Sequence, residues 1–439
     1  MSSAEREKGR PTVFSIRFYR SGFDLKWIVF LLVIFLISAR PLIADEEEKP
    51  DDWERRLEML RSVPYLGTTR DTVTGGQTGV LYRVLEKAQP GYNFYCAKDT
   101  REAFLMDMDG VIVHRWTYPL EISKEADGTG GSDHAIFLEN GDLIVIRRNE
   151  ELLRIDRDSR ILWKRDMLAH HDVAAAPDGS FYVIVQEFRR YRGLRVWFDN
   201  LVHLSADGHE IDRWETFRHL DELKAALDTT DFLDTVLDQR PEPPPPGNDS
   251  LYVGRPKTRG HGYDYFHMNT ITVLPGTPLG ERDGRFRAGN LLACFRSVNQ
   301  IAVLEKDTYR ALWAWGQDEL EWPHHPTLLD NGHILIFDNG VKRQRSRVVE
   351  MDPLTGEIVW QYAPPPPEVF YSYTRGSAQR LDNSNTLICE SDKGRAFEVT
   401  PQGEIVWIWL NPETVGDVRK TVYRMIRHPV DLFDGFLQD

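Results

Sequence analysis

The stretch Gly403-Glu404-Ile405-Val406-Trp407 belongs to a pattern of turn, apolar pair and tryptophan that occurs six times in this 439-residue chain. Successive tryptophans are separated by 47, 51, 99, 47 and 47 residues. A period near 47 with four strand-sized apolar runs is typical of a β-propeller blade, whose sheet buries both faces against its neighbours. The 99-residue interval holds one blade and an insertion of roughly 50 residues. The pattern ends at Trp116, Trp163, Trp214, Trp313, Trp360 and Trp407.

A second repeat runs ahead of the first and marks the start of each blade. It consists of a polar residue, several apolar positions and a hairpin turn such as Asn331-Gly332. Asn-Gly and Asp-Gly favour hairpins because a type I′ turn needs positive φ at both central residues. The polar residue therefore begins the innermost strand of its blade. Five units begin with His134, His171, His267, His324 and Arg375, and the first begins with Gly91-Tyr92-Asn93-Phe94-Tyr95-Cys96.

These repeats predict an all-β fold, a six-bladed β-propeller that spans residues 78–410. An insertion at about residues 219–262 holds an amphipathic stretch, Leu220 to Leu237, and a proline-rich run. It either covers the mouth of the channel or is a surface excursion without a role in access. Residues 411–439 are interpreted as a C-terminal amphipathic tail.

The N-terminal region predicts a transmembrane helix. Residues 27–44 are apolar and nearly uncharged, and they follow a basic N-terminus, residues 1–26. Because acidic residues open the juxtamembrane spacer, residues 45–77, the positive-inside rule keeps the N-terminus cytoplasmic and exports the rest. We favour an uncleaved signal anchor, although Ser38-Ala39 offers a small-residue cleavage site. The protein is therefore expected to be membrane-anchored and extracytoplasmic, on the periplasmic or outer face.

Charge and cysteine content exclude other classes of protein. A formal net charge of −14 argues against a nucleic-acid-binding surface, which needs a basic face to displace counterions. The three cysteines, Cys96, Cys294 and Cys389, lie singly in strand-like runs, so we expect buried thiols and no disulfide framework. No metal-ligand spacing involves them.

The histidines at the blade starts form the candidate site. The innermost strands of a propeller surround its axis, so residues that begin them converge on one mouth of the channel. Each histidine alone is ordinarily a hydrogen-bonded strand residue. Histidines at equivalent places in four blades would instead gather groups that titrate near neutrality into one cavity, which favours a functional site.

Three segments around these positions resemble the bacterial arylsulfotransferase family, whose members act without a nucleotide sulfate donor. The resemblance covers about residues 90–410 and implies a six-bladed propeller. It also implies transfer of a sulfuryl group from a phenolic sulfate ester to a phenol through a sulfohistidine, with no metal and no cofactor. The segments are His267-Met268-Asn269-Thr270-Ile271, Cys294-Phe295-Arg296-Ser297 and Trp322-Pro323-His324-His325-Pro326-Thr327-Leu328-Leu329-Asp330-Asn331-Gly332, with Arg375-Gly376-Ser377-Ala378-Gln379 beyond them.

The resemblance also implies roles for single residues. His324 matches the nucleophile by its distance from the Asp330-Asn331-Gly332 turn, and the neighbouring His325 stays open as an alternative. The catalytic set is His324, His171, His267 and Arg296, and the substrate-binding set is Asn269, Arg375, His134 and His325. Expected partners are aryl sulfates, phenols and, through the N-terminal helix, the membrane; a homodimer is compatible with the sequence.

These residue types suit sulfuryl transfer. A neutral imidazole is a nucleophile at pH 7, and its labile sulfuryl adduct splits one difficult displacement into two easier ones. A guanidinium can neutralise the equatorial oxygens of a loose transition state, and a second histidine can protonate the leaving phenolate and deprotonate the acceptor.

Other functions compete with this interpretation. A non-catalytic propeller could bind a ligand or a protein at the same mouth, and a hydrolase could use water as the acceptor. A quinone-dependent dehydrogenase is disfavoured because such propellers have eight blades with tryptophan docking repeats. The chain also differs from the well-known periplasmic arylsulfotransferases, which have a nearby disulfide-forming cysteine pair and lack this proline-rich insertion.

Overall fold

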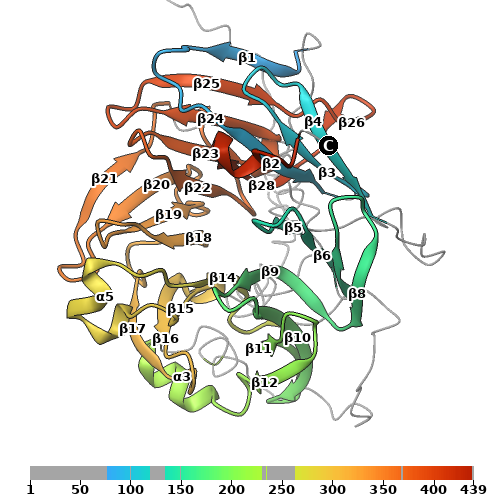
Figure 1. Cartoon of the computed structure of the whole chain (residues 1–439). Coiled ribbons are helices and arrows are strands. Elements are labelled where there is room, and N and C mark those ends of the chain that lie inside the picture. Colours follow the sequence, from blue (N-terminus) through green and yellow to red (C-terminus); the bar gives the residue numbers. More distant parts are fainter. Residues whose placement is uncertain are drawn as a thin grey trace, which may run out of the picture. The chain divides into compact units, whose positions relative to one another are not determined.

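The computed structural model describes residues 77–98, 100–118, 134–148, 150–229, 234, 263–366 and 369–437. These residues form six antiparallel blades and one separate hairpin, β26 (Thr414–Val415) with β27 (Val418–Arg419). The innermost strands of successive blades contact one another around the centre (Figure 1). The prediction of an all-β six-bladed propeller is confirmed.

In each of the first three blades, four strands follow one another from the centre of the ring outward. Blade 1 consists of β28 (Val422–His428), β2 (Tyr92–Ala97), β3 (Glu102–Met106) and β4 (Ile112–Thr117). Blade 2 consists of β5 (His134–Phe137), β6 (Leu143–Arg147), β7 (Glu151–Ile155) and β8 (Ile161–Asp166). Blade 3 consists of β9 (Ala169–Ala175), β10 (Phe181–Tyr191), β11 (Leu194–Leu204) and β12 (Glu210–Trp214), with β13 (Tyr263–Asp264) parallel to β11.

The other three blades follow the same order. Blade 4 consists of β14 (Met268–Val273), β15 (Leu291–Phe295), β16 (Gln300–Leu304) and β17 (Ala311–Trp315). Blade 5 consists of β18 (Pro323–Leu328), β19 (Ile334–Asp338), β20 (Arg347–Met351) and β21 (Ile358–Tyr362). Blade 6 consists of β22 (Ser377–Arg380), β23 (Thr386–Glu390), β24 (Arg395–Val399), β25 (Ile405–Leu410) and, outermost, β1 (Gly79–Arg83).

The repeated tryptophans tie neighbouring blades together. The indole N–H of Trp116 donates to the Gly141 carbonyl at 3.3 Å, and that of Trp163 donates to the Ala206 carbonyl at 3.0 Å. Trp360 and Trp407 make the same kind of bond, to Pro401 at 2.8 Å and Met108 at 3.0 Å. Each of these bonds runs from an outer strand to a turn of the next blade, which gives the 47-residue repeat a physical reason.

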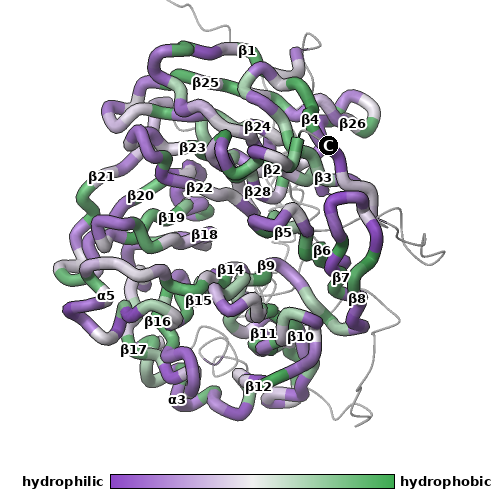
Figure 2. The backbone as a smooth tube through the Cα atoms, in the orientation of Figure 1, coloured by the Kyte–Doolittle hydropathy of each residue, from purple (hydrophilic) through white to green (hydrophobic). Residues whose placement is uncertain are grey.

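Hydrophobic packing follows the same arrangement. The buried apolar side chains fall into six clusters, one at each interface between neighbouring blades. Cys96, Cys294 and Cys389 are buried thiols within these clusters. Figure 2 shows hydrophobic residues along β19 and hydrophilic residues along the inner strands β18 and β22. Because the core lies between the blades, the centre of the ring is left to polar side chains.

Both ends of the described chain close the ring. Strand β1 pairs with β25 in the last blade, and β28 pairs with β2 in the first. Residues 422–428, placed by the sequence interpretation in an amphipathic tail, are thus the innermost strand of blade 1. The segment that opens with Gly91 is the second strand of that blade and not the first. Val422–His428 begins with valine and has its histidine at the last position, and no Asn-Gly or Asp-Gly turn leads from it to a second strand, so it lacks the signals that mark most other inner strands.

Several predicted segments fall wholly or partly outside the described residues. Of the insertion, helix α3 (Leu220–Ala226) confirms the amphipathic start, and its buried residues are Leu220 and Leu223. No helix among the described residues is long and apolar enough to span a membrane. The predicted transmembrane helix at residues 27–44 lies outside the described part of the chain, so the structure gives it no support.

Candidate active site

The predicted histidines come together at the start of the inner strands. His134, His171, His267, His324 and His325, hereafter the histidine cluster, are all buried. The ring centroids of His171 and His267 are 4.6 Å apart, and the Tyr423 hydroxyl lies 3.4 Å from His171 Nδ1. Four blades thus bring histidines into one small volume, as the repeat predicts.

Backbone irregularities set the directions of three of these side chains. His171, His267 and His325 have φ values of 58°, 51° and 49°, in the left-handed region that residues other than glycine rarely occupy. The ladder register shifts next to each of them, where β9, β14 and β18 pair with their neighbours. Such bulges re-aim side chains and are common beside active sites, where strain of this kind also gathers.

The imidazole of His324 is held from one side. Its Nδ1 lies 2.7 Å from the Asn339 side-chain oxygen and 3.0 Å from the Trp322 carbonyl. The Asn339 amide nitrogen donates to the carbonyls of Ser372 and Arg375, at 2.7 and 2.9 Å, which fixes its oxygen toward His324. Two acceptors at Nδ1 require the proton there, so Nε2 carries the lone pair. This tautomer is the one that a nucleophilic imidazole needs.

His325 has the same tautomer by a different contact. Its Nδ1 donates to the Ala378 carbonyl at 3.1 Å, and its amide donates to the Thr270 hydroxyl at 3.1 Å. The two neighbours differ in their surroundings. After burial, the strongest influence on the pKa is Arg296 for His324 and Arg424 for His325.

Arg296 supplies positive charge beside His324. It follows β15 as the first residue of a short 3₁₀ turn, η2 (Arg296–Val298), and its amide donates to the His267 carbonyl at 3.1 Å. Burial, and after it the charge of Arg296, lowers the pKa of both His324 and His267 well below its ordinary value. A guanidinium near a neutral imidazole suits an anionic substrate.

His267 forms a buried pair with an aspartate. Its Nδ1 lies 2.8 Å from Asp264 Oδ2, and among the described residues its Nε2 has no hydrogen-bond partner. Burial raises the pKa of Asp264 and lowers that of His267. Both shifts favour the uncharged forms of the two groups, and the 2.8 Å contact lets a proton pass between Asp264 and His267 Nδ1 when Nε2 gains or loses one.

Sequence reasoning missed a second group of residues. Asp172 lies 3.6 Å from His134 Nε2 and 3.0 Å from Arg424 Nη2, and the ring of Tyr423 stacks on His134 with centroids 4.4 Å apart. Tyr423 and Arg424 come from the closing strand β28, whose place in the ring was not predicted. Asp172 directly follows His171, and Asp264 precedes His267 by three residues, so a search for carboxylates near the histidines would have found both.

Two predicted substrate-binding residues have internal partners. The Asn269 amide donates to the Pro323 carbonyl at 2.9 Å, which braces the strand that carries His324. Arg375 Nη1 lies 3.2 Å from the Thr374 hydroxyl and 3.6 Å from Asp392. A Cβ on Gly376 would lie 2.2 Å from the Phe337 ring, so this glycine permits the close approach of the Arg375 segment. Their roles toward substrate stay predictions.

The buried histidines predict a pH-dependent stability. Burial lowers the pKa of all five members of the histidine cluster well below the ordinary 6.5. Below that pH, these histidines are therefore protonated in the unfolded chain but not in the folded chain. Stability is therefore full above pH 6.5 and falls as the pH drops, by up to about 1.4 kcal/mol per pH unit for each histidine. The buried Asp172, Asp264 and Asp338, whose pKa values are raised, act in the opposite direction but are fewer than the five histidines.

Urea unfolding at pH 7.5 and 5.5 measures this effect. We expect a clearly lower midpoint at pH 5.5, and we expect His134→Gln to reduce the difference between the two pH values. A midpoint that is equal at both pH values would contradict the assignment of neutral buried imidazoles.

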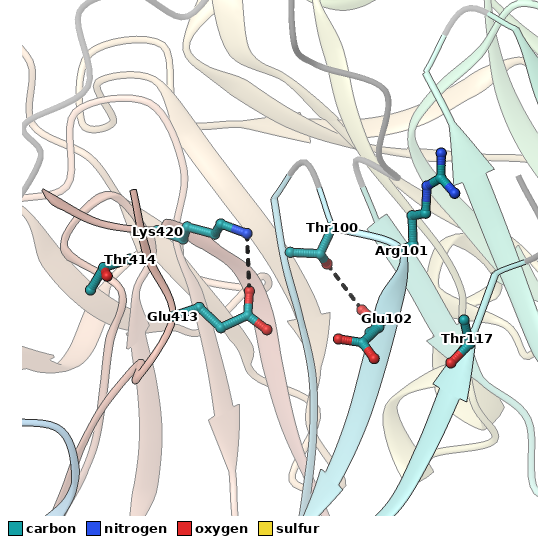
Figure 3. Close-up of a pocket in the computed structure, with 7 residues that line it drawn as sticks. All are labelled: Thr100, Arg101, Glu102, Thr117, Glu413, Thr414 and Lys420. Atoms are coloured by element: carbon teal, nitrogen blue, oxygen red, sulfur yellow. Dashed lines mark hydrogen bonds and ion pairs between the residues drawn. The ribbon is translucent and has the colours of Figure 1, made fainter. Parts of the chain in front are cut away.

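A separate hollow of about 550 Å³ lies away from the histidine cluster. It is bordered by β3, β4 and the β26–β27 hairpin (Figure 3), and Lys420 pairs there with Glu413 at 3.3 Å. Its side chains are threonines and charged residues, without histidine or cysteine. Among the described residues, no three His, Cys, Asp or Glu side chains are arranged to hold a metal ion. The histidine cluster remains the candidate active site.

Comparison with known proteins shows what the chain resembles. Three solved structures are similar at low sequence identity. A protein of unknown function from Bacteroides caccae has 14% identity and a TM-score of 0.44, and the match covers 76% of this chain and 100% of that one. A streptogramin B lyase has 12% identity and a TM-score of 0.43, with 82% and 97% covered. A virginiamycin B lyase from Staphylococcus aureus with quinupristin has 11% identity and a TM-score of 0.42, with 78% and 87% covered. No curated protein matches. The family model described as Arylsulfotransferase (ASST) matches residues 134–411, more than half of the chain and every member of the histidine cluster. The chain belongs to the arylsulfotransferase family.

Proposed function

We propose that this protein transfers a sulfuryl group from an aryl sulfate ester to a phenol through a sulfohistidine at His324. The observation that supports this most is the hydrogen bonding of His324, whose Nδ1 faces two oxygen acceptors while Arg296 lies nearby. Family membership supports the same class of reaction.

In the first step, the lone pair of His324 Nε2 attacks sulfur and the bond from sulfur to the aryl oxygen breaks. The leaving phenolate takes a proton from His267 Nε2, and the Asp264 proton moves to His267 Nδ1. The adduct carries a positive imidazole ring, which the Asn339 and Trp322 oxygens stabilise at Nδ1. Arg296 neutralises charge on the sulfuryl oxygens in the transition state.

In the second step, an acceptor phenol gives its proton to His267 Nε2, and the proton at Nδ1 returns to Asp264. The phenol oxygen attacks sulfur, the bond from sulfur to His324 Nε2 breaks, and the neutral imidazole is restored. The same buried pair therefore serves as acid and then as base, as a ping-pong transfer requires. The electron pair that formed the adduct returns to Nε2.

We also propose that the propeller is anchored to a membrane by residues 27–44 and works on its extracytoplasmic side. The charge asymmetry around that segment supports this placement. Protease accessibility of the propeller in intact cells and in spheroplasts tests it; digestion only after the inner membrane is opened would overturn the proposal.

The experiment that tests the function uses the full chain, purified in detergent, with p-nitrophenyl sulfate. We expect nitrophenolate release that accelerates when phenol is added, and a quenched protein that is one sulfuryl group heavier when phenol is absent. Release that is independent of phenol would indicate a hydrolase. Neither adduct nor release across several aryl sulfates would favour a propeller that only binds ligands.

A further inference from the structure

Trp322 occupies a constrained backbone position beside His324, and no role was predicted for it from the sequence. Its φ is 56°, in the left-handed region where a bulky aromatic residue is a genuine outlier. Its amide donates to the Asn299 side-chain oxygen at 2.9 Å, and its carbonyl accepts from His324 Nδ1 at 3.0 Å. Strain of this kind persists only where the surroundings enforce it, and it gathers at functional sites.

The indole of Trp322 contacts the arginine of the candidate site. Arg296 Cζ lies 4.3 Å from the centre of the Trp322 ring, within the range of a cation–π interaction. Asn299, which holds the Trp322 amide, ends the same 3₁₀ turn that Arg296 begins. One residue therefore contacts the imidazole through its backbone and the guanidinium through its side chain.

An aromatic surface continues from Trp322 onto the neighbouring blade. The Trp322 and Tyr373 rings are 5.4 Å apart, and those of Tyr373 and Tyr371 are 6.4 Å apart. All three side chains are only partly buried, unlike the histidine cluster next to them. Partly exposed aromatic rings beside a cationic group suit a ligand that joins a planar ring to an anion.

We propose that Trp322 is a positioning residue for Arg296, and that Trp322 with Tyr373 recognises the aromatic ring of an aryl sulfate whose anionic head reaches Arg296. This inference rests on the proposed function, because it assumes an aryl sulfate at His324. It adds the part of the site that selects an aryl ring.

Sulfonates test the inference separately from catalysis, because their carbon–sulfur bond is not broken and no sulfuryl group can be transferred. Calorimetry on the full chain would compare benzenesulfonate with methanesulfonate. We expect wild type to bind benzenesulfonate about tenfold more tightly, and Trp322→Leu to remove most of that preference and to weaken methanesulfonate binding too. Trp322→Phe should restore most of the preference, and Tyr373→Leu should reduce it without changing methanesulfonate binding.

Trp360→Leu is the matched control. Trp360 also lies under an arginine, with Arg380 Cζ 4.8 Å from its ring, but on the outer strand β21. We expect this variant to keep the wild-type preference. The proposal is overturned if folded Trp322→Leu keeps the full preference, if Trp360→Leu loses as much, or if wild type binds neither sulfonate. Failure to find a sulfuryl adduct would instead count against the proposed function alone.

Discussion

His324→Ala is expected to abolish the sulfuryl adduct and to lower kcat/KM for p-nitrophenyl sulfate by roughly 10⁴-fold or more, because it removes the proposed nucleophile. His325→Ala should keep the adduct and lose no more than about tenfold, a loss typical of a residue that contacts substrate without reacting. The measurement is intact mass after quenching, together with steady-state rates.

His324 and His325 make an informative pair because they share their strand, their burial and their tautomer. Both lie on β18, both are buried, and each donates its Nδ1 proton to an oxygen atom. They differ in that Arg296 influences His324 whereas Arg424 influences His325. An adduct that survives His324→Ala and disappears in His325→Ala would assign the nucleophile to His325.

The blades were predictable because the signals that mark them are local. Four of the six repeated tryptophans donate a hydrogen bond from one blade to the next, as Trp116 does to Gly141, and this shared contact accounts for much of the tryptophan repeat. The starts of five of the six inner strands were predictable for the same reason, whereas the innermost strand of blade 1, Val422–His428, was not predicted. Once six blades are counted, the convergence of His134, His171, His267 and His324 follows from the symmetry of the fold.

The rest of the site could not be found in this way. Tyr423 and Arg424 reach the histidine cluster only because the last strand of the chain pairs with the first blade, a contact between residues more than 300 positions apart. The support of His324 by Asn339 depends on a side-chain rotamer that no repeat encodes. Long-range closure and rotamers are three-dimensional facts, whereas periodicity is a property of the sequence itself.

The closing strand depends on an ion pair that is completely buried. Arg427 on β28 pairs with Glu398 on β24, and the two side chains are 1% and 0% exposed. Arg427 also donates to the Asn93 side chain at 2.9 Å, and Glu398 accepts from Asn385 at 2.6 Å. These contacts join the last blade to the first blade, to which the C-terminal strand β28 belongs.

Removal of Glu398 is therefore expected to destabilise the propeller strongly. Glu398→Ala leaves Arg427 buried without its counter-charge, and we expect a loss of about 3–5 kcal/mol in urea unfolding. Glu404→Ala is the matched control, because Glu404 also pairs with a distant lysine, Lys87, but at the surface, with side chains 51% and 48% exposed. That change should cost no more than about 1 kcal/mol. Equal losses would mean that the buried pair does not hold the ring closed. A large loss in Glu398→Ala alone would mean that ring closure, and with it the position of Tyr423 and Arg424 in the site, depends on this pair.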